Sequence, residues 1–301
     1  MHVPPLRPLP PPTPEQAARE QRRVAQGALV GMIDAHVHLF PQPLFAALHR
    51  WFDTNAWQIA FRGTSEETIA HLRAHGIDRM VALVFGHKPG AARTLNRYLG
   101  ELAAAEPGVI GVGTVLPGEP DARAIVQEAI AIHGLRGIKL HCHVQRVAID
   151  DPATVDVLAM CQELGVPAVV HAGREPSSAA YGVDTHAICN VQRTRRVLQQ
   201  LPDLRLVVPH IGADEYSDYL HLCDEFPHLY LDTAMACAQY FPETLDWQLL
   251  ERHADRVLYG TDFPIVPYDV GRERTVLARQ IVSDAAFAQI AGGNAARLWG
   301  V

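Results

Sequence analysis

Short apolar runs rich in β-branched residues alternate along the chain with longer segments whose apolar side chains recur every three or four residues. The short runs predict buried strands and the longer segments predict amphipathic helices. Val155, Leu158 and Cys161 illustrate the helical spacing. Such an alternation is typical of a parallel sheet with crossover helices. We expect strands at residues 32–38, 79–85, 109–115, 137–141, 168–171, 205–210, 229–233 and 257–261.

Eight strand–helix units in a chain of 301 residues predict a single (β/α)8 TIM barrel, a fold that typically needs about 250 residues. A doubly wound open sheet is the alternative. The turn after the first strand disfavours it, because Pro41-Gln42-Pro43 lacks the glycines of a phosphate-binding turn. We therefore expect an N-terminal arm and short helix over residues 1–29 and one barrel domain over residues 30–301.

Two connections and the N-terminus depart from the regular pattern. Residues 1–14 are rich in proline and predict an extended arm, followed by a short helix over residues 15–26. The connection of residues 40–63 carries six aromatic side chains, so it is either a packed helical insertion or a wall of the active-site pocket. A second irregular stretch, residues 173–185, contains Arg174 and Tyr181 and is also expected near the substrate.

Composition narrows the class of partner. The net charge of -7 and a pI near 6.1 give no electrostatic reason to expect nucleic acid or an anionic membrane, so a small molecule is the expected partner. Five cysteines without a Cys-x-x-Cys pair argue against a disulfide framework and fit a reducing cytoplasm. No apolar run reaches the length of a membrane-spanning helix, and the proline-rich start lacks the apolar centre of a signal peptide.

Several predicted strands end in histidine, lysine or aspartate, residues that can bind metal ions or transfer protons. An apolar strand that ends in histidine is unusual for core packing, because a buried imidazole must find a hydrogen-bond partner. A single such histidine is usually structural, but several at the mouth of one barrel indicate a metal cluster. The polar strand ends are His36 and His38, which share a strand face, Lys139 and His141 on the fourth strand, His171 on the fifth, His210 on the sixth and Asp262 after the eighth.

These strand ends lie within motifs that resemble those of the amidohydrolase superfamily, in particular the branch that includes aminocarboxymuconate semialdehyde decarboxylase and lactone hydrolases. The motifs are Asp34-Ala35-His36-Val37-His38, Gly137-Ile138-Lys139-Leu140-His141, Val170-His171-Ala172-Gly173, Pro209-His210-Ile211-Gly212, Tyr259-Gly260-Thr261-Asp262-Phe263-Pro264 and Gly292-Gly293-Asn294-Ala295-Ala296-Arg297. They extend from residue 32 almost to the C-terminus.

The resemblance implies one divalent ion held by His36, His38, His171 and Asp262, with His210 close by. Zinc is favoured by the imidazole ligands, and manganese is the alternative. Such an ion lowers the pKa of a bound water towards about 7, and the water can then attack a carbonyl. Asp262 would accept the proton of that water, and His210 would polarise the substrate carbonyl or transfer a proton.

The implied function is hydrolysis of a small amide, ester or lactone. Nonoxidative decarboxylation on the same scaffold is the alternative, since both reactions use nearly the same ligands. A non-catalytic metal-binding protein is the remote alternative, and it would have a filled coordination sphere. The proline-rich arm and the aromatic insertion are compatible with a homodimer.

The remaining polar residues carry weaker predictions. Lys139 either binds an anionic substrate group or, once carboxylated, bridges two ions together with His171 and His210; we favour the first role and a single ion. His141 is expected to line the substrate pocket, and Arg174 either grips a substrate carboxylate or forms a surface ion pair. His143 is expected in a loop, His87 and Lys88 near the mouth, Asp34 in a structural pair, Cys142 as a buried thiol and Asn294 as the cap of the last helix.

Overall fold

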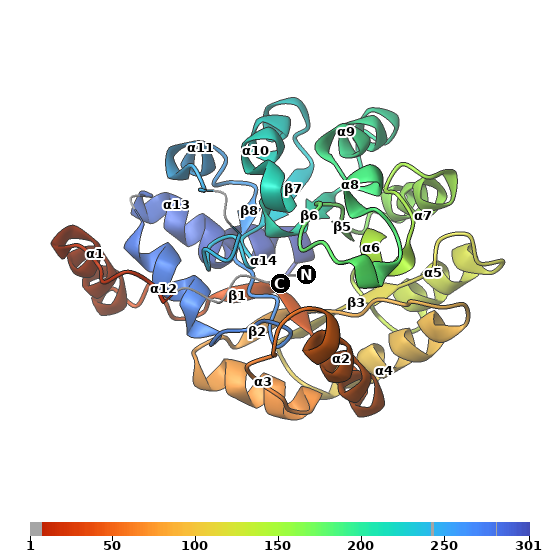
Figure 1. Cartoon of the computed structure of the whole chain (residues 1–301), viewed down its shortest axis with the longest axis horizontal. Coiled ribbons are helices and arrows are strands. Elements are labelled where there is room, and N and C mark those ends of the chain that lie inside the picture. The colour runs from red at the N-terminus through yellow and green to blue at the C-terminus, as the bar shows by residue number, and fades with distance from the viewer. Residues whose placement is uncertain (1–7, 242–243, 281) are drawn as a thin grey trace.

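Eight parallel strands form one sheet in chain order, and helices cover its outer face (Figure 1). The computed structural model describes residues 8–241, 244–280 and 282–301. This order confirms the predicted β/α barrel and excludes a doubly wound sheet, in which the strand order reverses. The strands are β1 (Ile33–His38), β2 (Arg79–Leu83), β3 (Val109–Thr114), β4 (Ile138–His141), β5 (Ala168–His171), β6 (Leu206–Val208), β7 (Leu229–Asp232) and β8 (Val257–Leu258).

Backbone hydrogen bonds between β1 and the segment after β8 close the barrel. The amide of Asp262 donates to the carbonyl of His36 at 2.8 Å, and the amide of His38 donates to the carbonyl of Phe263 at 2.8 Å. A parallel bridge pairs Val37 with Phe263. The two ends of the sheet therefore meet at the residues that the sequence singles out as metal ligands.

Helices alternate with the strands and form a ring around the barrel (Figure 1). Short 3-10 segments lie at η1 (Ala179–Tyr181) and η2 (Pro209–Glu215), and a π-helical turn, η3, spans Gln289–Gly293. The α-helices are α1 (Pro14–Ala25), α2 (Gln42–Asn55), α3 (Ser65–Ala74), α4 (Ala91–Ala105), α5 (Ala122–Ala131), α6 (Cys142–Gln145), α7 (Pro152–Glu163), α8 (Thr185–Ile188), α9 (Val191–Gln200), α10 (Tyr216–Glu225), α11 (Trp247–Arg252), α12 (Gly271–Arg279), α13 (Asp284–Ala288) and α14 (Asn294–Trp299).

The strands have apolar side chains on both faces, as parallel strands covered by helices require. On β2, Val81 and Leu83 belong to the cluster that fills the barrel interior, whereas Met80 and Ala82 pack in the larger core between the strands and the helices. Leu298 and Trp299 of α14 join the interior cluster, so the last helix contributes to the filling of the barrel. The interior is thus a packed core, and the polar residues are left at one end of the strands.

A β-bulge in β1 aims both of its histidines into the mouth. The register between β1 and β2 shifts between Asp34 and Val37, so β1 carries one more residue than its partner there. Ala35 belongs to the interior cluster, and without the bulge Val37 would follow it to the same face. Val37 instead packs in the outer core, and its neighbours His36 and His38 have their ring nitrogens 3.3 Å apart.

The structured strands are shorter than predicted where left-handed backbone follows them. We expected the sixth strand to continue to His210, but β6 ends at Val208, and His210, Ile211 and Ala213 have positive φ values. Asp262, beyond β8, also has a positive φ of 59°. Non-glycine residues rarely adopt this region, and such strained positions cluster at active sites. Both candidate catalytic residues, His210 and Asp262, are therefore placed by unusual backbone geometry.

The predicted N-terminal helix is present as α1 and packs against α12 (Figure 1). Thr13 caps it, since its side chain accepts from the Gln16 amide while the Gln16 side chain accepts from the Thr13 amide. Arg23, at its C-terminal end, is completely buried. The Arg23 guanidinium donates to four backbone carbonyls at and beyond the end of α12, those of Leu277, Ala278, Gln280 and Val282.

Two further expectations are settled by the fold. All five cysteines are free and buried, Cys142 among them, so the prediction of a buried thiol is confirmed. Asn294 does not cap the last helix as expected, because its side-chain amide instead donates to the carbonyls of Ala254 and Val257. It therefore ties α14 to the start of β8. Among the described residues, no helix combines the length and apolarity that crossing a bilayer requires.

Candidate metal centre

The polar strand ends meet at the mouth of the barrel, as the sequence predicts. The structure also adds a residue that the sequence analysis missed, Asp232 at the end of β7. Most of these side chains are buried, so they are held away from bulk water, where the effective dielectric constant is low and electrostatic interactions are strong. The buried set consists of His36, His38, Lys139, His171, His210, Asp232 and Asp262, and His141 is half-buried.

His36 and His38 direct their Nε2 atoms toward one point. Nδ1 of His36 lies 2.8 Å from Oδ2 of Asp232, and Nδ1 of His38 lies 3.1 Å from the carbonyl oxygen of Leu83. A carboxylate and a carbonyl oxygen only accept, so each Nδ1 carries a hydrogen and Nε2 is the ring nitrogen left to bind an ion. The two Nε2 atoms lie 3.3 Å apart, and 3.2 and 3.0 Å from Oδ1 of Asp262.

The Nε2 atoms of His36 and His38 and Oδ1 of Asp262 converge in a negative field that suits a cation. Burial by itself would lower the pKa of His36, but the carboxylates of Asp232 and Asp262 outweigh it and raise this pKa to about 9. That same negative field attracts a divalent ion. Burial by itself would raise the pKa of Asp262, yet His36 and His38 hold it well below the usual range, so the carboxylate stays ionised as a ligand must. The donor set of two imidazoles and one carboxylate is therefore suited to a divalent metal.

His171 lies beside this group and contacts His210. Nε2 of His171 is 3.1 Å from the carbonyl of Glu175, and Nδ1 of His210 is 2.9 Å from the carbonyl of Ala234. With both hydrogens engaged by carbonyls, the remaining nitrogens face each other at 3.2 Å as a second pair of acceptors. Burial lowers the pKa of His210 to about 4 and that of His171 well below 6.5, so both rings are neutral.

Candidate ligand atoms in the mouth fall into three groups, and the atoms of each group lie within 4.8 Å of one another. One contains His36, His38 and Asp262, which are three of the four predicted ligands, and another contains His36 with His210 and Asp232. The fourth predicted ligand, His171, instead groups with His141 and His143. His143 corrects a prediction, because it is not in a loop but in the one-turn helix α6, fully buried, with Nε2 donating to the carbonyl of Gly173 at 2.9 Å. A histidine beyond a strand end gives no sequence signal for that burial.

Lys139 is buried in the same mouth with an unpaired charge. Its Nζ has no hydrogen-bond partner within the described part of the chain. Burial lowers the pKa of the Lys139 ammonium to about 8, against the opposing attraction of Asp232 and Asp262. An unpaired buried ammonium costs stability, so a site of this kind is usually built for an anionic partner.

Asp232 is the functional residue that the sequence analysis missed. It is fully buried, and besides contacting His36 it accepts hydrogen bonds from the amides of His210 and Ala234 at 3.0 and 3.1 Å. One carboxylate thus orients a histidine of β1 and the backbone at His210. The available signal was the run Leu229-Tyr230-Leu231-Asp232, an apolar strand that ends in an acid just as others end in histidine.

Asp34 and Arg174 have structural partners. Asp34 accepts from the Thr261 hydroxyl at 2.6 Å and from the amides of His36 and Thr261, so it joins β1 to the segment after β8 as the expected structural pair. Arg174 pairs with Asp214 at 2.9 Å and with Glu215 at 3.5 Å. This contact corresponds to the ion-pair alternative for Arg174 and occupies the guanidinium.

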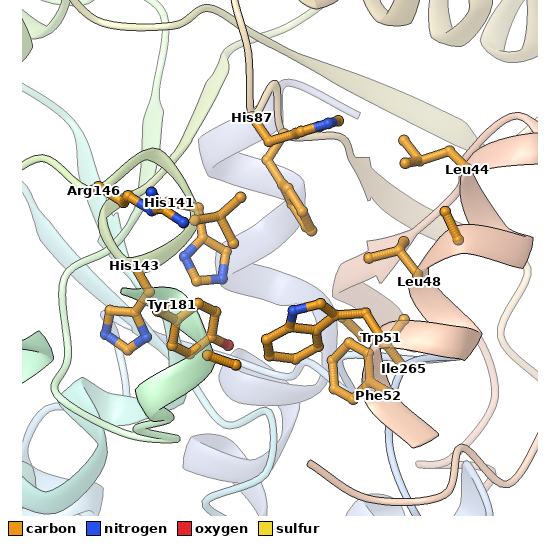
Figure 2. A pocket seen from close by; sticks show the side chains of 14 residues that line it. Leu44, Leu48, Trp51, Phe52, His87, His141, His143, Arg146, Tyr181 and Ile265 are labelled. Carbon is orange, nitrogen blue, oxygen red and sulfur yellow. The ribbon is translucent and has the colours of Figure 1, made fainter. Parts of the chain in front are cut away.

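An apolar pocket of about 270 Å³ opens next to the metal-binding residues (Figure 2). Trp51 and Phe52 from α2 form one side, so the aromatic insertion is both a packed helix and a pocket wall, while His141, His143 and Arg146 lie on the other side. A smaller pocket lined by His36, His38, Lys139, His171 and Asp262 shares Phe52, His141, Tyr181 and Ile265 with it, so the apolar space leads to the polar mouth.

Arg146 and His87 bring polar groups to this apolar pocket. Arg146 is exposed, has a left-handed backbone with φ of 57°, and has no hydrogen-bond or ion-pair partner among the residues described. His87 lines the pocket, as its position after β2 predicts. Neither pocket is lined by Lys88 or Arg174. The free cationic group of the pocket is therefore Arg146 rather than the expected Arg174.

Comparison with known proteins supports the fold and the family. The model of a family described as Amidohydrolase matches residues 33–301. No curated protein sequence gives a significant match. An uncharacterized TIM-barrel protein from Bordetella bronchiseptica has 22% sequence identity and a TM-score of 0.68, with 90% of this chain and 99% of the other covered.

Two solved structures of decarboxylases have the same fold. The 5-carboxyvanillate decarboxylase from Novosphingobium aromaticivorans, with bound manganese and 3-methoxy-4-hydroxy-5-nitrobenzoic acid, has 17% identity and a TM-score of 0.66 over 91% of this chain and 99% of the other. The dihydroxybenzoic acid decarboxylase from Polaromonas, with manganese and 2-nitroresorcinol, has 18% identity and a TM-score of 0.65 over 90% and 97%. At these identities the likeness shows the fold.

Proposed function

The chain belongs to the amidohydrolase family, and from this premise we propose that it is a metal-dependent hydrolase of a small ester, lactone or amide that carries an anionic group. The observation that carries the proposal is the convergence of the Nε2 atoms of His36 and His38 on the ionised carboxylate of Asp262. We assign these three residues and His171 as the ligands of a single ion. When bound, a divalent ion activates water and polarises a carbonyl.

The protein's own groups supply proton transfer around the carbonyl. Asp262 is ionised and can accept a proton from water. His210 is neutral and presents Nε2 to the mouth, because its Nδ1 hydrogen is held by the Ala234 carbonyl. Lys139, with a pKa of about 8, can either pair with a substrate anion or donate a proton to the leaving group. In this scheme Asp262 acts as the base, His210 positions the carbonyl and Lys139 acts as the acid.

The adjoining pocket defines the substrate class. Its walls include Trp51, Phe52 and Tyr181, and the rings of Trp51 and Tyr181 lie 5.2 Å apart at 33°. Such walls favour a flat apolar body. Arg146 offers an unpaired guanidinium, which binds carboxylates and phosphates through paired hydrogen bonds. We therefore assign as substrate a planar molecule with one anionic substituent, of a size that fits a pocket of about 270 Å³.

Decarboxylation is the second candidate, and the apolar pocket beside Arg146 favours it. A carboxylate that is removed from water loses its hydration, which promotes release of neutral carbon dioxide. Two fold neighbours are decarboxylases of aromatic acids. Against it, His36 and His38 keep Asp262 ionised, so this carboxyl group is poorly suited to protonate a carbanion at neutral pH.

Zinc is the proposed metal, because imidazole nitrogen predominates among the ligands, and manganese is the alternative that the fold neighbours bind. One ion is proposed, with Lys139 uncarboxylated, because its unpaired Nζ is then free to meet a substrate anion. A homodimer and a cytoplasmic location stay predictions from the sequence.

A product assay separates the candidate functions. The purified protein, loaded with zinc or manganese, is incubated with aryl esters, lactones, anilides and hydroxybenzoates, and released acid and carbon dioxide are measured separately. Acid without carbon dioxide supports hydrolysis, and carbon dioxide without hydrolysis establishes the decarboxylase instead. A protein that binds metal but turns over no substrate in either class, and shows no exchangeable water on the metal, is the non-catalytic alternative.

The assignment of Arg146 has its own test. Arg146→Met should raise KM for anionic substrates about tenfold or more, with a smaller effect on kcat, because a charge-assisted hydrogen bond is lost. Neutral esters of the same acids should be affected little. Arg123→Met is the matched control, because Arg123 is exposed and pairs with Asp156 away from the pocket. Equal losses for neutral and anionic substrates would contradict an anion-binding role.

A further inference from the structure

A second cluster of metal-binding side chains lies in the helical layer, apart from the mouth. His71 in α3 and His75, which caps the C-terminus of that helix, are four residues apart and so lie on the same side of it. Asp269 approaches them from the connection between β8 and α12. One ligand atom from each lies within 4.8 Å of the other two, and the two imidazoles are half-buried.

The His75 ring is already oriented as a metal ligand. Nδ1 of His75 lies 2.8 Å from the backbone carbonyl of His71, so Nδ1 carries the hydrogen and Nε2 carries the lone pair. Metal-binding histidines are commonly fixed in this way, through a hydrogen bond from the second ring nitrogen to a carbonyl. The His71 ring is stacked on Phe263 at 5.3 Å and 11°, and its nitrogens have no hydrogen-bond partner in the part of the chain described.

The charges around the cluster allow a cation. Burial, followed by the neighbouring His75, lowers the pKa of His71, so this ring is neutral at physiological pH. Asp269 uses Oδ1 to accept from the Gly271 amide at 2.8 Å, which leaves its other oxygen for a ligand. Arg274 is the nearby positive group, and it donates to the backbone carbonyl of His75 rather than facing the ring nitrogens.

We infer that His71, His75 and Asp269 form a second, peripheral site for a transition-metal ion such as zinc. Two imidazoles and one carboxylate are a common zinc donor set, and the remaining position would be taken by water. The site joins α3 to the segment that carries Asp262 and Phe263 into α12. A bound ion therefore holds the outer helices to the strand end that contributes a residue to the mouth, and stabilises the folded protein by mass action.

Zinc binding to the whole protein tests this site. The protein is stripped with a chelator and dialysed, and then zinc stoichiometry and Tm are measured with increasing zinc chloride. His36→Ala/His38→Ala, which removes ligands at the mouth, should still bind one zinc equivalent and show a zinc-dependent rise in Tm. Adding His75→Gln or Asp269→Asn should abolish both, while His75→Gln alone should remove one equivalent from the otherwise unchanged protein.

The control is His221→Gln, which changes a histidine that is 59% exposed and lies outside these clusters. It should leave stoichiometry and the zinc-dependent Tm unchanged. Asp269 is exposed, so Asp269→Asn tests the site even where a histidine variant fails to fold. The inference is overturned when His75→Gln and Asp269→Asn bind as much zinc as the unchanged protein. Because the double mouth variant isolates the peripheral ion, that outcome leaves the proposed hydrolase unaffected.

Discussion

Asp232 accepts a hydrogen bond from Nδ1 of His36 at 2.8 Å, and both side chains are buried. The contact fixes which nitrogen of His36 faces the mouth, and a partner of this kind typically changes metal affinity 10- to 100-fold. Asp232→Asn should therefore weaken zinc binding by about that factor while leaving the ligands in place. Competition with a zinc chelator measures the change. An unchanged affinity would show that Asp232 has only a structural role.

The mouth histidines should separate into ligands and a proton-transfer residue. His36→Ala and His38→Ala are each expected to lose the ion together with activity, because the converging acceptor set becomes incomplete. His210→Ala should lower kcat by about 100-fold or more and keep most of a single ion. Elemental analysis and steady-state kinetics on the same samples test both statements. A loss of half the metal in His210→Ala would instead indicate two ions with a modified Lys139.

Lys139→Met tests the unpaired ammonium in the mouth. Since Nζ has no hydrogen-bond partner among the described residues, replacing it with an apolar side chain of similar length should keep or raise Tm. Activity on anionic substrates should fall strongly, and one ion should remain. Thermal unfolding, kinetics and metal analysis distinguish these effects. If metal content halves, Lys139 is a bridging ligand and the assignment of a single ion is wrong.

The buried carboxyl group of Glu273, which lies outside the metal centre, should make the stability of the protein depend on pH. It is completely buried, and burial raises its pKa well above 4.5, although hydrogen bonds from Tyr268 and the Met235 amide oppose this. Above pH about 4.5 the folded state therefore keeps a proton on Glu273 that the unfolded state releases. The free energy of unfolding consequently decreases as the pH rises toward the pKa of Glu273 in the folded state. In this range the free energy of unfolding should fall by at most about 1.4 kcal/mol per pH unit.

Glu273→Gln should remove this dependence, because a neutral amide replaces the titrating group with little change in shape. Its stability relative to the unchanged protein should increase with pH between about 5 and 8. Chemical denaturation at several pH values measures the difference. Parallel pH profiles for the two proteins would show that Glu273 does not titrate in this range.

The strand positions and most of the mouth were predictable from local sequence. Apolar β-branched runs indicate the strands, and a chain-order barrel brings their carboxyl ends together, so the sequence predicts that His36, His38 and Asp262 lie close to one another, as they do in the structure. The two-residue spacing of His36 and His38 also predicted their shared direction, although the bulge that aims them inward depends on the register with β2 and has no local signal.

What escaped prediction depends on contacts between distant segments. Asp232 was not recognised, because its partner His36 is 196 residues away. Arg174 was considered as an anion ligand because it lies just beyond His171, yet Asp214 occupies it in the fold, and Arg146 was not considered. Sequence spacing along one segment cannot show which guanidinium is left without a counter-ion.

The contacts of the buried Arg23 show that the folded domain extends to the N-terminal side of the family match. The family match starts at residue 33, beyond α1, so a shortened chain designed on that boundary would omit Arg23. Four carbonyls around the end of α12 would then lose their common donor. The N-terminal helix thus stabilises the C-terminal end of α12 from within the same chain. A separate peptide spanning residues 8–30 should therefore restore stability to a barrel that lacks this helix.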